Sequence, residues 1–382
     1  MKKYLILLLF TFLACTTEKI EQHIIDSGEN SIENPERLTP EEFEYMTYLL
    51  TVESEMSTFW NGFNSIRDEP IFIQTGDDEG IFINPPNSMR DNSRAILNEL
   101  TDFETLYLYR NDEIKTFIIE ELNGSLYDFQ LEYEGIPIYA YNITELIDFN
   151  FYHLYKNRDG FYNVSVFLHE LFHFYSLVLN EELFVDEDSI YVSNEFPYNE
   201  DTLPLILLLY DVMIDAYHLD TTIQKTNYLK YYVSIQHKLN SLDTSENNLV
   251  RNYLFVREKT EGAARYIEVF STLYTINNNT IEDPTHGFKE YSENITDWWG
   301  VLDVYDFRMP YHTGAGAINL LNELDCPNWE EKFLIPENTP FDIAYDCLNM
   351  NDSQLDIFLE EVKSLYDWDA LVERSEFLLS LQ

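Results

Sequence analysis

Short apolar runs with the composition of strands dominate the first part of the chain. Residues 70–86 contain two such runs on either side of a glycine-bounded turn, which predicts a hairpin. Residues 126–143 contain two more, with a turn at Glu134-Gly135 between them. Pro137 has no amide hydrogen to donate to a neighbouring strand, so it favours an edge position for the last run. These patterns predict a small sheet.

The helical period of 3.6 residues appears before this sheet and dominates after Thr144. Thr39 is the expected N-cap of the first helix, Pro40 suits its first turn, and Glu42 completes a capping box. Later helical segments span residues 203–217, 221–239, 247–274, 314–324, 351–368 and 369–381. We therefore expect an α+β fold, with a mixed α/β part at residues 39–150 and a mostly helical part at residues 151–382.

The N-terminus has the pattern of a secretory signal rather than of a folded element. Residues 1–15, MKKYLILLLFTFLAC, join a basic start to an apolar stretch that is too short to span a bilayer. The end of this stretch resembles the bacterial lipobox, which implies acylation at Cys15, although Phe12 departs from the usual Leu. The alternative is an ordinary signal peptide that ends near a cysteine. Residues 16–38 are polar and predict a tether between the lipid and the folded domain. Acylation at Cys15 would place the protein in the bacterial cell envelope as a lipoprotein.

Composition and charge narrow the possible functions. Hydrophobic residues make up 45% of the chain, which excludes a disordered protein and allows a large core. The formal net charge of −46 repels phosphate backbones, which argues against nucleic-acid binding. This charge indicates either simple solubility or a preference for cationic substrates or divalent metals. Apart from Cys15, the chain has two cysteines, Cys326 and Cys347. Outside the cytoplasm these two can either form a disulfide or stay as buried thiols.

An H-E-x-x-H motif, formed by His169, Glu170 and His173, lies inside the apolar and aromatic run at residues 164–178. On an α-helix, residues four apart lie about 40° apart around the axis and about 6 Å apart along it. Both imidazoles can therefore hold one zinc ion, and Glu170 comes out beside the metal, where it can accept a proton from water. The alternative is a pair of core histidines bonded to the backbone, with Glu170 on a solvated edge.

A catalytic zinc usually keeps three protein ligands. Metzincins carry a Gly and a third His where this chain has Ser176 and Leu179, which excludes that class. Residues 259–270, KTEGAARYIEVF, resemble the NEGFAxYxE segment of the aminopeptidase N family, a group of gluzincins in which the first Glu binds zinc. The matching residues are Glu261, Gly262, Ala264, Tyr266 and Glu268. The resemblance makes Glu261 the third ligand, and the alternative is an exposed helical glutamate.

This segment carries two further expectations and one departure from the family. Small residues after Glu261 would let its helix lie close to the histidine helix, and Arg265, one turn on, could orient a carboxylate or contact substrate. Residues 174–260 separate the second histidine from Glu261, a far longer gap than in the familiar gluzincins. An insertion that contains the apolar helix at residues 203–217 would account for it. Glu195 lies nearer the familiar spacing in a loop-like stretch and stays as the alternative third ligand.

Residues 309–321, MPYHTGAGAINLL, resemble the PYxKGxxxLxxL segment of the same family, in which the Tyr donates a hydrogen bond to the oxyanion. The match gives this role to Tyr311 and makes Gly314 the family's glycine. His312 is a second candidate, since thermolysin-like enzymes use a His. The alternative is a Tyr packed on a helix N-terminus, with Gly-Ala-Gly-Ala as a close helix contact.

The specificity of such a peptidase stays open. We find no G-x-M-E-N segment, with which aminopeptidases hold the free amine of a substrate. Residues 135–143, shortly before the histidine helix, could instead pair as an edge strand with an extended substrate. An endopeptidase or an unassigned peptidase is the resulting expectation.

The resemblances together imply a zincin-like fold and a zinc peptidase of gluzincin type that acts on peptides or proteins. His169, His173 and Glu261 would hold zinc. Glu170 would act as the base, and Tyr311 would donate to the oxyanion. A surface-exposed binding lipoprotein with a structural or vestigial metal site is the alternative from another class. A zinc hydrolase that acts on a non-peptide bond is a third possibility.

Overall fold

The fold is given by a computed structural model that describes most of the chain after residue 36. The described residues are 37–60, 69–77, 79–90, 94–96, 107–110, 112–128, 131–143, 159–178, 196–273 and 292–382. The expected signal peptide with Cys15, nearly all of the expected tether, and Glu195 lie outside these residues. Leu38, which we placed at the end of the tether, is instead buried in the hydrophobic core, because its apolar side chain packs there.

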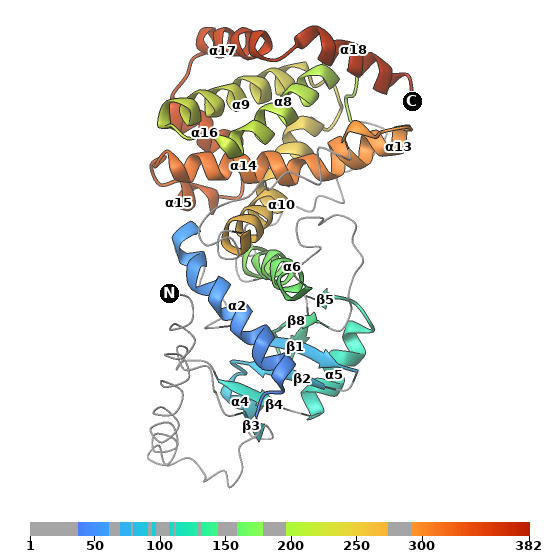
Figure 1. Cartoon of the computed structure of the whole chain (residues 1–382), viewed down its shortest axis with the longest axis vertical. Helices are drawn as coiled ribbons and strands as arrows, with labels where there is room; N and C mark the ends of the chain where they lie inside the picture. The colour runs from blue at the N-terminus through green and yellow to red at the C-terminus, as the bar shows by residue number, and fades with distance from the viewer. Residues whose placement is uncertain are drawn as a thin grey trace, which may run out of the picture.

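The described part of the chain is mixed α+β and 66% helical, with a small mixed sheet and a helical C-terminal part. The sheet lies at one end and most of the helices lie at the other (Figure 1). Helices α6 (Asp159–His173) and α10 (Phe255–Ile267) lie between the two parts. Within the described residues every strand precedes residue 143, and every regular element from Asp159 onward is helical. This arrangement agrees with the change of period in the sequence.

Helix α2 (Pro40–Phe59) begins as the sequence predicts. The Thr39 side chain accepts a hydrogen bond from the Glu42 amide at 3.2 Å, and the Glu42 carboxylate accepts one from the Thr39 amide at 2.9 Å. Glu42 also accepts a hydrogen bond from Arg110 Nη2 at 2.7 Å. The capping box therefore also ties the start of α2 to the sheet.

The main sheet has six strands in the order β3–β4–β2–β1–β8–β5. Their bounds are Ile71–Gly76 (β1), Glu79–Ile83 (β2), Arg94–Ala95 (β3), Leu108–Arg110 (β4), Tyr127–Asp128 (β5) and Tyr139–Asn142 (β8), with the short helix α4 (Asn87–Arg90) after β2. Strands β1 and β2 form the predicted hairpin, with Ile71 opposite Ile83. Strand β8 runs parallel to β1 and antiparallel to β5, which makes the sheet mixed.

The prediction that residues 135–143 form an edge strand is only partly right. Residues 135–143 do not form one edge strand, because the run divides at Ile138. Strand β7 (Ile136–Pro137) pairs with β6 (Glu132–Tyr133) across the predicted turn, where Glu134 and Gly135 have φ angles of 53° and 82°. Strand β8 enters the sheet between β1 and β5. Its tyrosines are fully buried against α6, so the described edge nearest the histidine helix is β5 and not residues 135–143.

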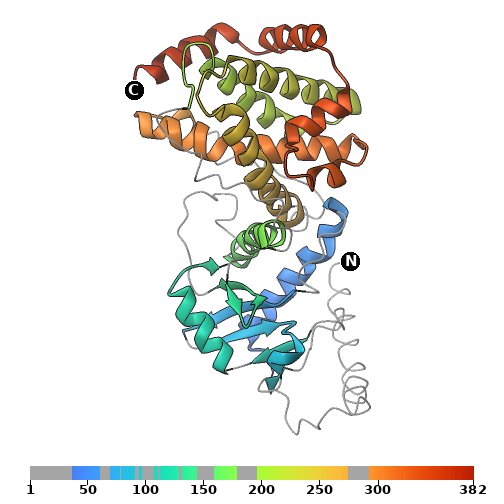
Figure 2. The same cartoon turned by 180° about the vertical axis from the view of Figure 1, so that it is seen from behind.

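The two faces of the sheet pack against different helices, as the two-residue period of a strand requires. On β1, Ile71 and Ile73 belong to the main core with α2 and α6, whereas Phe72 belongs to a smaller cluster with Ile118. Ile118 lies on α5 (Asp112–Leu122), which covers the other face of the sheet (Figure 2). The main core continues into the C-terminal helices, so α6 is packed between the sheet and the helical part.

In the helical part α14 packs closely along α10. Its elements after α6 are η2 (Phe174–Val178), α8 (Leu203–Asp215), η4 (Ala216–His218), α9 (Thr222–Leu242), η5 (Val250–Leu254), η6 (Glu268–Leu273), α13 (Trp298–Val301), η7 (Leu302–Arg308), α14 (Met309–Glu323), α15 (Trp329–Phe333), α16 (Pro340–Leu348), α17 (Asp352–Leu365) and α18 (Trp368–Leu379). None of the helices in the described part has both the length and the apolar character needed to cross a membrane.

Two glycines let α10 and α14 approach each other closely. A Cβ added to Gly262 would lie 2.6 Å from the Cα of Gly314, and one added to Gly314 would lie 2.3 Å from the backbone oxygen of Glu258. The small residue after Glu261 therefore serves the contact with α14, whereas we expected it to serve the contact with the histidine helix. The glycine-alanine run of α14 is a close helix contact, as the alternative interpretation of that segment proposed.

A disulfide joins Cys326 to Cys347. Cys326 follows the end of α14, and Cys347 lies on α16, so the bond links two helices of the C-terminal part. This resolves the two alternatives that the sequence left open. It also agrees with an oxidising compartment, in which disulfides persist.

A buried carboxyl, Glu258, crosslinks three helices beside this contact. It accepts hydrogen bonds from the Tyr232 hydroxyl at 2.6 Å and from Gln236 Nε2 at 2.8 Å, both on α9, and from the Thr313 hydroxyl at 2.5 Å on α14. Glu258 is fully buried. Burial raises its pKa to about 7, although the three donors oppose this shift.

Glu258→Gln should remove a pH dependence of stability. Because the folded pKa of about 7 exceeds the ordinary value of 4.5, the folded state holds this proton more tightly than the unfolded state does. The stabilisation is complete below the ordinary pKa and is lost as the pH rises through about 7. From about pH 5 to about pH 7.5, wild type should lose about 2 kcal/mol more unfolding free energy than the variant. Urea unfolding at both pH values measures this difference, and parallel pH profiles for the two proteins would contradict it.

Candidate metal centre

Helix α6 places both motif histidines in a buried position at the contact with α10. His169 is 5% exposed and His173 is 7% exposed. The apolar neighbours bury the other faces of the helix, as the sequence predicts. These buried neighbours are Val166, Phe167, Leu168, Leu171, Phe172 and Phe174. Tyr139 on β8 donates a hydrogen bond to the Phe167 carbonyl at 3.1 Å, which ties the helix to the sheet. Helix α6 is therefore held between the sheet and the helical part.

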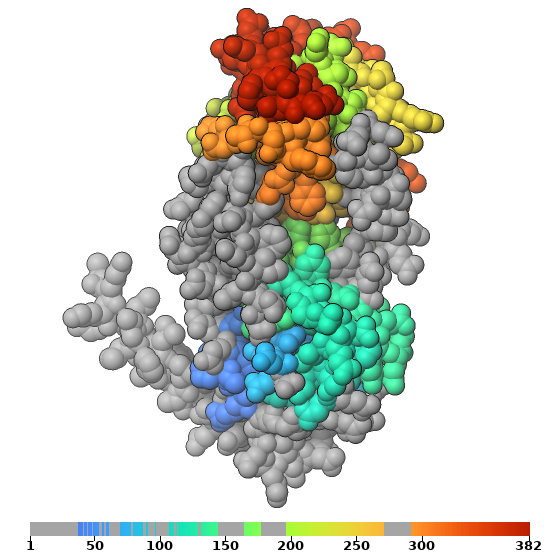
Figure 3. Space-filling model, turned by 90° about the vertical axis from the view of Figure 1, so that its right-hand side faces the viewer, coloured from blue at the N-terminus to red at the C-terminus, as the bar shows by residue number. Residues whose placement is uncertain are grey.

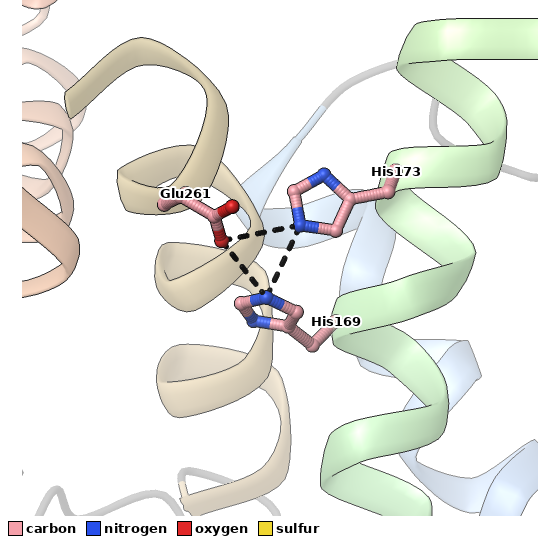
Figure 4. Close-up of side chains that lie close together, drawn as sticks. All are labelled: His169, His173 and Glu261. Atoms are coloured by element: carbon pink, nitrogen blue, oxygen red, sulfur yellow. Dashed lines mark hydrogen bonds and ion pairs between the residues drawn. The ribbon is translucent and has the colours of Figure 1, made fainter. Parts of the chain in front are cut away.

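Glu261 meets the two histidines across the contact between α6 and α10. Its Oε2 atom lies 3.4 Å from His169 Nε2 and 3.3 Å from His173 Nε2, and the two nitrogens lie 3.2 Å apart (Figure 4). Three ligand atoms on a tetrahedral zinc, each about 2.05 Å from the metal, lie about 3.3 Å from one another. The triangle has this size, so the three side chains fit a zinc ion. In the described part of the chain no other group of metal-binding side chains is arranged in this way.

A second carboxylate fixes the orientation of the first histidine. Glu268 Oε2 lies 3.2 Å from His169 Nδ1, and Arg265 Nη1 donates to Glu268 Oε1 at 2.5 Å. Arg265 therefore orients a carboxylate, one of the two roles expected from the sequence. With a proton on Nδ1 directed at Glu268, His169 keeps Nε2 available for a metal, which is how outer carboxylates tune zinc-bound histidines.

Charge within the cluster is balanced among these groups. Burial lowers the pKa of His169, but hydrogen bonds to Glu261 and Glu268 more than offset this and raise it to about 10. Burial raises the pKa of Glu261, but the neighbouring His173 and His169 bring it well below its ordinary value. A proton on His169 thus balances the negative charge of the Glu261 carboxylate in the absence of a metal. A divalent cation would supply positive charge in its place and displace that proton.

Glu268→Gln should weaken zinc binding by about 10- to 100-fold without abolishing it. The amide keeps the shape of the side chain but loses the charge that holds the Nδ1 proton of His169 and pairs with Arg265. Titration of the metal-free protein with zinc against a competing chelator measures the affinity. Glu246→Gln, at an exposed glutamate outside the site, is the matched control. An unchanged affinity in the Glu268 variant would mean that the carboxylate has no role in orienting His169.

Glu170 lies beside the triangle and is not one of its corners. It is 8% exposed, and burial raises its pKa while the His169 and His173 charges lower it. Burial raises the pKa of Tyr127 on β5, and the nearby charge of Glu170 raises it further. A buried carboxylate that contributes to no corner of the triangle remains available to take up a proton.

The structure separates the two candidates for the oxyanion donor. The ring of Tyr311 stacks on that of His169, with centroids 5.8 Å apart and planes 8° apart. His312 is 1% exposed on another side of α14, and burial, followed by the Arg265 charge, brings its pKa well below its ordinary value. Tyr311 thus lies against a candidate ligand, whereas His312 lies in the packed interior near Arg265.

The contact of Glu268 with His169 was missed from the sequence. Glu268 comes seven residues after Glu261, which is two helical turns, so its place on the same face of the helix was a usable signal. Glu195, the alternative third ligand, lies outside the described residues.

Comparison of the chain with known protein families, with curated proteins and with solved structures finds no match. The function of the site is therefore inferred from the residues of this chain alone.

Proposed function

We propose that this chain is a zinc-dependent peptidase of gluzincin type. The observation that carries the proposal is the triangle of His169, His173 and Glu261, with edges of 3.2–3.4 Å, beside the buried carboxylate of Glu170. A structural metal site needs only its ligands. A base held next to them, at a cost in desolvation, favours catalysis over the alternative of a binding lipoprotein.

The architecture supports a zincin-like fold. A helix with the H-E-x-x-H motif packs on a small sheet, and a later helix in a helical part supplies the glutamate. Residues 174–260 carry the chain through α8 and α9 before it returns at α10, which is the kind of insertion that the long spacing required. Strand β5, the described edge nearest α6, takes over the substrate-pairing role that we first gave to residues 135–143.

The residues of the chain would divide the reaction among them. Zinc held by the triangle would supply Lewis-acid chemistry, making water nucleophilic near neutral pH and polarising the scissile carbonyl. Glu170 takes a proton from the attacking water and delivers it to the leaving amine. Tyr311 donates a hydrogen bond to the carbonyl oxygen as negative charge develops there. Glu268 and Arg265 keep His169 in its orientation throughout.

The same proposal assigns a location and a substrate class. A lipid on Cys15 would anchor the protein in the bacterial cell envelope, and the substrate would be a peptide or protein. The disulfide between Cys326 and Cys347 supports an oxidising compartment outside the cytoplasm.

The proposal is tested on the purified protein by metal analysis and by incubation with a mixed peptide library. We expect equimolar zinc, cleavage of library peptides, loss of cleavage with a zinc chelator, and recovery when zinc is restored. Bound zinc without hydrolysis of any peptide would overturn the peptidase assignment. Hydrolysis of esters or amides alone would then indicate a different zinc hydrolase, and no hydrolysis at all would favour a binding protein.

A further inference from the structure

Phe307 is an exposed aromatic residue beside the candidate metal centre. It lies on η7, one helical turn before Tyr311, and the centroids of the two rings are 6.0 Å apart. The ring of Tyr311 in turn stacks on that of His169, with centroids 5.8 Å apart. Although Phe307 is apolar, it is 47% exposed. Figure 3 shows orange atoms of this part of the chain at the surface, next to the green atoms of the α6 segment.

A buried guanidinium supports the ring of Phe307. Arg257 lies on α10, one helical turn before the candidate ligand Glu261, and is 7% exposed. Its guanidinium carbon lies over the ring of Phe307, 4.7 Å from the centroid, and over the ring of Tyr311 at 5.7 Å. Its Nη2 atom donates a hydrogen bond to the Phe307 carbonyl at 3.4 Å. Cation–π attraction and this hydrogen bond therefore hold the exposed ring against the helix that supplies Glu261.

The position of this ring suits contact with a side chain of a bound peptide. The rings of His169, Tyr311 and Phe307 form a row that leads from the triangle of candidate ligands to the surface. An extended peptide advances about 3.3 Å per residue, so a side chain close to a carbonyl at the metal can reach the outer end of this row. Covering apolar surface there is favourable, and a second aromatic ring adds a favourable ring–ring contact.

We propose that Phe307 forms the wall of a substrate subsite that takes a large apolar or aromatic side chain close to the scissile bond. The inference rests on the proposed function and names its substrate class, which is peptides with such a side chain next to the cleaved bond. The net charge of −46 alone would favour cationic peptides instead. The two expectations differ at the same substrate position, so the cleavage preference separates them.

Cleavage of the mixed peptide library by the full-length, zinc-loaded chain tests the subsite. Wild type should prefer a large apolar or aromatic side chain at one position close to the scissile bond. Two matched peptides then carry phenylalanine or alanine at that position. Phe307→Ala should lower the ratio of their kcat/KM values by about 10-fold. Phe307→Tyr keeps the ring and should keep the preference. Phe377→Ala, at an exposed phenylalanine on α18, is the matched control and should keep the wild-type ratio.

A second variant carries the test if circular dichroism shows that Phe307→Ala does not fold. Phe307→Leu keeps an apolar side chain on η7 and should lower the ratio by about 2- to 10-fold, because only the ring–ring contact is lost. An unchanged ratio in the folded Phe307 variants would overturn the subsite and leave the peptidase function intact. A wild-type preference for Lys or Arg close to the scissile bond would also overturn it, in favour of selection by net charge. A zinc-loaded protein that cleaves no library peptide would overturn the peptidase function and with it this subsite.

Discussion

Glu170→Gln should lower kcat for peptide hydrolysis by about 10²- to 10⁴-fold while the protein keeps its zinc. Glutamine has the shape of glutamate, but it cannot take a proton from water. Since Glu170 is not a corner of the triangle, its amide leaves the three candidate ligands in place. The measurement is kcat on a cleaved library peptide together with the zinc content of the same preparation.

Two comparisons make this result informative. Glu246→Gln, at an exposed glutamate, should keep full activity and shows that a carboxylate-to-amide change is harmless elsewhere. A Glu170 variant that retains wild-type kcat would exclude the proposed base, even if zinc remained essential. Loss of zinc together with activity would instead show that Glu170 helps to hold the metal.

The elements that the sequence predicted correctly are those set by local chemistry. The capping box at Thr39 and the hairpin of β1 and β2 depend on residues within a few positions of one another, and both were predicted at the right place. The edge position of residues 135–143 was wrong because it depends on which strand pairs on the outer side. Strand β5 supplies that neighbour with only two residues, too few to leave a pattern in the sequence.

The candidate site shows the same division between local and distant information. The i, i+4 spacing of His169 and His173 fixes their common direction on any helix, so the pair could be predicted from the sequence without a fold. The partnership of the pair with Glu261 depends on how α10 packs against α6, which the spacing alone does not define. Only the resemblance to a family segment suggested it, and the structure brings these three side chains together.

The contacts beyond the three candidate ligands depend on packing that no single segment encodes. Gly262 lies against Gly314, although the small residues after Glu261 led us to expect a close contact with the histidine helix. The approach of these two glycines sets the distance between the helix of Glu261 and the helix of Tyr311. The site is thus positioned by a contact that lies outside it.

Glu261→Ala should remove most of the zinc from the protein and with it the hydrolysis. The carboxylate supplies one of three corners of the triangle, so its loss should weaken binding by more than the roughly 10- to 100-fold expected for an outer-shell partner such as Glu268. Removing it also leaves the two buried histidines without the carboxylate that lies 3.3–3.4 Å from their Nε2 atoms. Zinc content by elemental analysis and zinc affinity by chelator competition are the measurements.

A variant of Glu195, the alternative third ligand, distinguishes the two candidates. Glu195→Ala should keep wild-type zinc content if Glu261 is the ligand. Loss of zinc in Glu195→Ala with full zinc in Glu261→Ala would instead make Glu195 the ligand. Glu261→Gln serves as a second variant, because it preserves the packing of the side chain at the contact between α6 and α10. If Glu261→Gln folds like wild type by circular dichroism and still loses zinc, the loss reflects the missing carboxylate. A folded Glu261→Gln protein with full zinc would show that the triangle does not bind the metal as proposed.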